Sequence, residues 1–120
     1  MPDGKICYVE IPAADIDRSV AFYTAVFGWE IRTRGDGAKA FNDATGAVSG
    51  SWVKGRQPSK DAGVLTYVMC DSIEATLKKI AAAGGQAVTP FTSIGPASDA
   101  FATFRDPAGN LFGLYQQTRK

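Results

Sequence analysis

In the first half of the chain, the spacing of apolar residues changes between the two-residue period of a strand and the 3.6-residue period of a helix. Apolar and polar residues alternate in short segments rich in β-branched and aromatic side chains, which is typical of strands. These segments are residues 6–11, 29–34, 38–42 and 47–53. After the first of them, apolar residues recur at helical spacing, at Ile16, Val20, Tyr23 and Phe27. Asp15 precedes this stripe where an N-cap is expected, and Gly28 follows it where a C-cap is expected. The pattern predicts the order β-α-β-β-β.

The same order returns after the polar segment KGRQPSKDAG, which reads as an internal linker. Asp71 and Glu74 have the spacing of a capping box and predict the start of the second helix. Its apolar stripe is Ile73, Leu77 and Ile80, and Gly84 with Gly85 ends it. The strands predicted around it are residues 64–70, 86–92, 101–105 and 110–117, with a loop at residues 92–99.

The two halves also resemble each other letter by letter. NDATGAVSGSWVK, residues 42–54, can be laid on RDPAGNLFGLYQQ, residues 105–117, at a separation of 63. The matched positions are Asp43, Gly46, Val48, Gly50 and Trp52 with Asp106, Gly109, Leu111, Gly113 and Tyr115. We interpret this as a duplicated βαβββ module, about residues 5–54 and 63–117, within one α+β domain of residues 1–120. Pairing the modules would let helices cover the outer sheet faces and leave the inner faces around a shared cleft.

Composition excludes several classes of partner. With 120 residues and a formal charge of +1, the chain has no basic block to favour nucleic acid and no apolar run of the ~20 residues that span a membrane. We therefore expect neither nucleic acid nor a membrane as partner. Cys7 and Cys70 lack metal or redox spacing, which favours reduced thiols in a cytoplasmic protein. Histidine is absent, which removes the commonest general base and transition-metal ligand.

Two stretches carry a family likeness. YVEIPAADIDRSVAFYTAVFGWEI and FATFRDPAGNLFGLYQ resemble the vicinal oxygen chelate superfamily, the relatives of glyoxalase, bleomycin-resistance proteins and extradiol dioxygenases. The likeness spans nearly the whole chain. It implies paired βαβββ modules curled around a cleft, and it suggests a homodimer, with modules paired within one chain or exchanged between two.

The resemblance also implies where a metal would be held. In metal-using relatives, the first and fourth strands of each module supply His or Glu ligands. The matching positions here are Tyr8, Gly50, Leu65 and Gly113. None of them offers a carboxylate or an imidazole, so the sequence predicts no metal and no other cofactor. The two glycines would leave space in the cleft, or would mark bulges or close packing in a curved sheet.

Strand alternation predicts which side chains line the cleft. If the four matched positions face inward, so do the residues two positions away on each strand. The predicted lining is Tyr8, Glu10, Val48, Trp52, Leu65, Tyr67, Met69, Leu111 and Tyr115. Such an aromatic and apolar lining with a few polar tips is typical of a small-molecule pocket. The alternative is that these residues fill the interior and leave no pocket.

Glu10 is the candidate polar anchor. It lies on an otherwise apolar strand and is expected to point inward. A carboxylate in such a place needs a hydrogen-bond partner, water or a raised pKa, and Tyr8, Tyr67 or Tyr115 could be that partner. Glu10 could bind a ligand's amine or hydroxyl group, act as a general base, or serve only as a structural carboxylate.

These observations favour a metal-free protein that binds a small hydrophobic or aromatic molecule in the cleft between the modules. The ligand-binding residues would be Tyr8, Glu10, Trp52, Leu65, Tyr67, Met69 and Tyr115. Two alternatives stay open. One is a lyase, isomerase or dioxygenase that uses Glu10 or an unrecognised metal site. The other is a structural or interaction module without a ligand.

Overall fold

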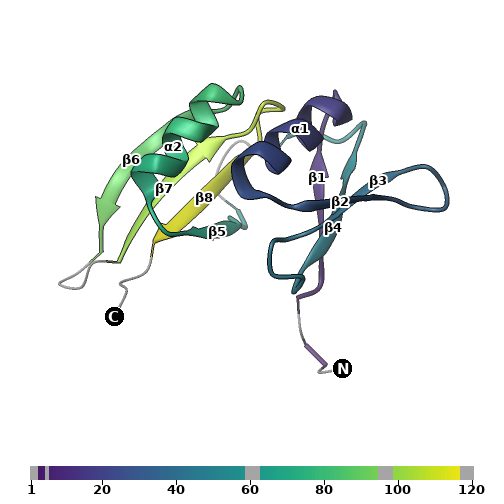
Figure 1. Cartoon of the computed structure of the whole chain (residues 1–120), viewed down its shortest axis with the longest axis horizontal. Coiled ribbons are helices and arrows are strands. Elements are labelled where there is room, and N and C mark those ends of the chain that lie inside the picture. Colours follow the sequence, from purple (N-terminus) through teal and green to yellow (C-terminus); the bar gives the residue numbers. More distant parts are fainter. Residues whose placement is uncertain (1–2, 5, 59–62, 95–98, 117–120) are drawn as a thin grey trace.

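The computed structural model describes residues 3–4, 6–58, 63–94 and 99–116, and in them each half of the chain has the predicted order of elements (Figure 1). Module 1 contains β1 (Tyr8–Pro12), α1 (Ile16–Phe27), β2 (Glu30–Thr33), β3 (Lys39–Asn42) and β4 (Ser49–Val53). Module 2 contains β5 (Tyr67–Cys70), α2 (Ile73–Ala82), β6 (Gln86–Ser93), β7 (Ala100–Arg105) and β8 (Leu111–Gln116). The α+β class with two βαβββ modules is confirmed. The module ends predicted at residues 5 and 117, and residues 95–98 of the predicted loop, lie outside the described residues.

The helices begin where short polar side chains cap them. The Asp15 carboxylate accepts a hydrogen bond from the main-chain N–H three residues on, as predicted. Gly28 ends α1 in the left-handed conformation, at φ 68°, which glycine adopts without strain. The second helix begins one residue later than predicted. Ser72 is extended and accepts the N–H of Ala75, so the serine is the N-cap instead of Asp71.

Each module folds into a mixed four-stranded sheet with its first strand parallel to its fourth. The strand orders are β1-β4-β3-β2 and β5-β8-β7-β6. One face of each sheet packs into a single core that both modules share with the neighbouring helices α1 and α2. The core includes Ile11, Phe41 and Trp52 from the first sheet, Phe104, Phe112 and Leu114 from the second, Phe22 and Tyr23 from α1, and Ile73 and Ile80 from α2. We call the opposite, uncovered faces the open face of module 1 and the open face of module 2.

The turn before the last strand is one residue longer in module 1 than in module 2. The N–H of Asp43 bonds to the carbonyl of Val48, five positions on, whereas that of Asp106 bonds to Asn110, four positions on. A shift of one residue turns every following side chain to the other face of a strand. Gly113 therefore corresponds to Ser51 and not to Gly50 as the ungapped repeat predicts.

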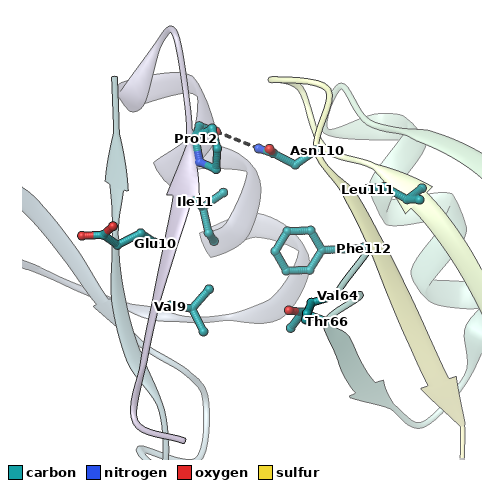
Figure 2. Close-up of a pocket in the computed structure, with 9 residues that line it drawn as sticks. All are labelled: Val9, Glu10, Ile11, Pro12, Val64, Thr66, Asn110, Leu111 and Phe112. Carbon is teal, nitrogen blue, oxygen red and sulfur yellow. Dashed lines mark hydrogen bonds between the residues drawn. The ribbon is translucent and has the colours of Figure 1, made fainter. Parts of the chain in front are cut away.

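The open faces of the two modules point away from each other. Val9 and Ile11 on β1 point toward Phe112 on β8 across a crevice between the modules, while Glu10 points to the other side of β1 (Figure 2). Leu111 likewise points away from the crevice on the far side of β8. One chain alone therefore does not enclose the cleft that pairing the inner faces was expected to form. The side that each module turns toward its neighbour is its core side.

Candidate functional site

A tyrosine lies across the open face of module 1. The Tyr8 hydroxyl donates to Ser51 Oγ at 3.1 Å and accepts from Arg34 Nη1 at 3.0 Å. Ser51 and Ala40, which pair in register beneath these side chains, are almost fully buried although they lie on the uncovered face. Tyr8 and Arg34 thus cover the middle of this sheet, and Tyr8 is itself 43 % exposed.

Arg34 is itself held by an acidic neighbour in the β2–β3 turn. Its guanidinium bonds to both carboxylate oxygens of Asp36, the shorter contact being 2.7 Å. The hydrogen bond from Arg34, with a further one from the N–H of Ala38, lowers the pKa of Asp36 to about 2. The hydrogen bond of Arg34 to Asp36, followed by its hydrogen bond to Tyr8, raises the pKa of Arg34. The turn therefore presents a fixed positive group to the tyrosine oxygen.

Glu10 lies on the same face but has a different partner from the one predicted. Arg56, from the segment that connects the modules, donates to its Oε1 at 2.7 Å. None of the tyrosines named in the prediction bonds to it among the described residues. Its carboxylate is about half exposed. Glu10 is therefore a solvent-accessible acid paired with an arginine, which favours a role in binding over one as a buried general base.

The open face of module 2 is more apolar. The Tyr67 ring lies over Gly113, where an added Cβ would overlap the ring atoms. Tyr67 is 46 % exposed and Met69 is 64 % exposed on this face. Tyr115, in register with Met69, donates from its hydroxyl to Asp99 Oδ2 at 2.8 Å, and this bond, more than burial, raises its pKa. Tyr67, Met69 and Tyr115 lie together as predicted.

The predicted position of Trp52 in the cleft lining is wrong. Trp52 is 3 % exposed and packs in the core, 4.9 Å from the Phe41 ring and 5.9 Å from the Tyr23 ring by centroid. Its register partner is Ile11, a core residue, so it faces the side opposite to Tyr8. The longer turn in module 1 causes this reversal. Val48, which was also predicted to line the cleft, lies two residues before Gly50 and therefore faces the core side as Gly50 does.

The two glycines also have separate tasks. An added Cβ at Gly50 would overlap the Val9 carbonyl on the neighbouring strand β1 and the Phe41 ring, which packs in the core. Gly50 therefore makes room for core packing, while Gly113 makes room for an open-face tyrosine. Of the two explanations offered by the sequence, close packing accounts for both glycines.

The donor groups on the open faces do not suit a divalent cation. With the turn length taken into account, the first and fourth strands place Tyr8, Glu10 and Ser51 on one open face, and Tyr67 and Gly113 on the other. Leu65 precedes β5 and is half-buried. Of these five open-face residues only Glu10 offers a carboxylate, and it already bonds to Arg56. The part of the chain that the structure describes holds no cluster of three ligands that could hold a metal ion.

Several residues of the open faces were not predicted from the sequence. Arg34 ends one predicted strand and Asp36 lies before the next, and opposite charges two residues apart in a turn are a signal for a local ion pair. Arg56 and Asp99 lie far along the chain from Glu10 and Tyr115, so no local pattern could pair them. Ser51 was hidden by the one-residue difference between the turns.

No helix within the described residues is long and apolar enough to cross a membrane.

The amino-acid sequence of the chain is similar to a known protein superfamily and to individual relatives. A sequence model of the Glyoxalase/Bleomycin resistance protein/Dioxygenase superfamily matches residues 5–114. A glyoxylase-like domain-containing protein of Didymella fabae is 29 % identical over 118 residues, covering 92 % of each chain. CFP32 of Mycobacterium bovis is 27 % identical over 124 residues, and the match covers 97 % of this chain but 47 % of that protein. The chain thus spans about half the length of this mycobacterial relative.

The fold recurs among solved structures. The genomically encoded fosfomycin resistance protein FosX of Listeria monocytogenes superimposes with a TM-score of 0.77 at 19 % identity, covering 98 % of this chain and 94 % of that one. At this identity the likeness concerns the fold alone.

Proposed function

Because the chain belongs to the glyoxalase/bleomycin resistance protein/dioxygenase superfamily, we propose that it binds a small hydrophobic or aromatic molecule on its open faces without a metal ion. The observation that carries the proposal is the set of large apolar side chains left exposed there, Tyr8, Tyr67 and Met69. Large apolar side chains left exposed on one face of a sheet are typical of ligand or partner surfaces.

A second copy of the chain completes the site. The two open faces of one chain point apart, so neither alone can surround a ligand. Their chemistry is complementary: module 1 offers hydroxyl and charged groups, and module 2 offers an apolar floor. Placing module 1 of one copy against module 2 of another gives a pocket with polar anchors and apolar walls. In a two-fold dimer the same contact occurs twice, so two equal sites form.

Within such a site each residue has a distinct task. Tyr67 and Met69 supply the apolar surface for a ring. Tyr8, held by Arg34 and Ser51, presents a fixed hydroxyl. Glu10 accepts a hydrogen bond from an amine or hydroxyl group of the ligand, taking the place of its bond to Arg56.

The experiment is a thermal-shift screen of aromatic compounds, with and without amine or hydroxyl substituents, in the presence of a chelator. A ligand at ~100 times its Kd stabilises the folded chain by ~2.7 kcal/mol. Over 120 residues this raises the melting temperature by about 11 °C. We expect Tyr67→Ala and Glu10→Gln to weaken binding. Glu74→Gln, which removes the same charge from an exposed position on α2, is the control.

The proposal fails if no compound shifts the melting temperature, if chelation abolishes the shift, or if both open-face variants bind as well as the control.

A further inference from the structure

The crevice between the modules is a second candidate site, separate from both open faces. Its volume is about 170 Å³, and Figure 2 shows its walls formed by β1 on one side and by β8 and the approach to β5 on the other. Val9, Ile11 and Phe112 point into it. An apolar cavity of ~150 Å³ is known to hold benzene. The crevice therefore has room for one six-membered ring with a small substituent.

Glu10 lines this crevice through its main chain, because its side chain points away. The register of the parallel pair β1–β4 fixes the direction of its N–H and C=O. Ser49 donates to the carbonyl of Cys7, and Ala13 donates to Val53, so the odd-numbered residues of β1 bond to β4. The N–H and C=O of Glu10 therefore point to the free edge, where no partner occurs among the described residues.

Leu111 contributes its main chain from the opposite wall. Asp106 donates to the carbonyl of Asn110, and Gly113 donates to that of Thr66. In an antiparallel pair successive residues alternate in direction, so the N–H and C=O of Leu111 point away from β7. Strand β5 begins its pairing only opposite Gly113. In the described part of the chain, nothing bonds to the main chain of Leu111.

One end of the crevice is closed by a side chain. Asn110 Nδ2 donates to the carbonyl of Pro12 at 2.7 Å across the gap (Figure 2). This bond shows that the free edge of β1 accepts hydrogen bonds from the β8 side at that end. Beyond it, main-chain donors and acceptors of both walls remain available beside an apolar floor.

We propose that this crevice binds a small planar ring that carries adjacent N–H and C=O groups, that is, a lactam or amide. The ring would lie against Val9, Ile11 and Phe112, which the hydrophobic effect favours. Its C=O would accept from the N–H of Leu111, and its N–H would donate to the carbonyl of Glu10 or Leu111. These main-chain groups have no hydrogen-bond partner among the described residues. A hydrocarbon of the same size would satisfy the apolar walls but not these groups.

The test compares three probes on the uniformly ¹⁵N-labelled full chain: 2-pyridone, 1-methyl-2-pyridone, which lacks the donor, and toluene, which lacks both groups. We expect 2-pyridone to shift the amide resonances of Glu10 and Leu111 and to bind about fivefold more tightly than 1-methyl-2-pyridone, the effect of one net hydrogen bond, with toluene binding more weakly still. Equal affinity of the three probes, or resonances of Glu10 and Leu111 that no probe moves, overturns the proposal.

A variant pair gives an independent readout. Leu111→Pro removes the main-chain N–H while Leu111→Ala keeps it, and the side chain lies outside the crevice in both cases. Proline is tolerated where the N–H is outside the ladder, as it is here. We expect both pyridones, whose C=O accepts from this N–H, but not toluene, to bind Leu111→Pro about fivefold more weakly than Leu111→Ala. Equal affinity of 2-pyridone for the two variants contradicts the proposal. If that variant does not fold, the three-probe comparison still decides.

Discussion

Replacing each of the two strand glycines by alanine tests the assignment of the sheet faces. At Gly50 the added Cβ meets the Val9 carbonyl and the Phe41 ring, both fixed within the sheet and core. We expect a cost near the upper end for overpacking, ~3 kcal/mol. With an unfolding entropy of about 2.1 cal/mol/K per residue, a chain of 120 residues would lose about 12 °C of melting temperature.

At Gly113 the added Cβ meets the Tyr67 ring, which is half-exposed and can turn outward. The expected cost is ~1 kcal/mol, or about 4 °C. In a Tyr67→Ala background this cost should nearly vanish. A Phe41→Ala background should relieve Gly50→Ala only in part, because the Val9 carbonyl remains.

Calorimetric melting of the single and double variants measures these differences. Equal losses at the two glycines, or a Gly50→Ala cost that Phe41→Ala removes entirely, would refute the assignment of Gly50 to the core side and Gly113 to the open face.

Two further predictions concern polar contacts. Tyr23 donates to Asp106 Oδ2 at 2.8 Å in the buried contact between the modules. Tyr23→Phe should therefore lower the free energy of unfolding by ~2 kcal/mol, the loss of a hydrogen bond to a charged group. A denaturant midpoint equal to that of the unaltered chain would contradict this prediction. Because the pKa of Asp36 is lowered to about 2, its contribution to stability is present above its ordinary pKa and is lost as pH falls toward 2. An NMR titration should find this midpoint near 2, and Arg34→Gln should move it upward; a midpoint that stays in place would show that Arg34 does not set it.

The order of elements could be predicted from the sequence because it depends on local signals. Alternation, helical stripes and caps such as Asp15 and Gly28 act within a few residues, and the structure keeps them. The second N-cap was misplaced because Asp71 and Ser72 are both good caps, and only the backbone conformation chooses between them.

The site was predicted only in part because its geometry depends on a single residue of turn length. An ungapped repeat puts Trp52 on the face of Tyr8, and the longer Asp43–Val48 turn reverses that. Module 2 has no such shift, so Tyr67, Met69 and Tyr115 were placed correctly relative to one another. The opposite directions of the two open faces follow from core contacts distant in sequence, such as Tyr23 with Asp106, which no local pattern contains.

The central claim is that the two open faces of one chain point apart and meet only between two copies. Distance measurement by electron paramagnetic resonance tests it most directly. Chains labelled at Glu10→Cys are mixed with chains labelled at Met69→Cys, both with Cys7 and Cys70 replaced by serine. We expect a defined distance between chains that is short compared with the 48 Å length of one chain. Dilution with unlabelled chains should weaken the signal. The absence of any interchain signal would contradict the claim.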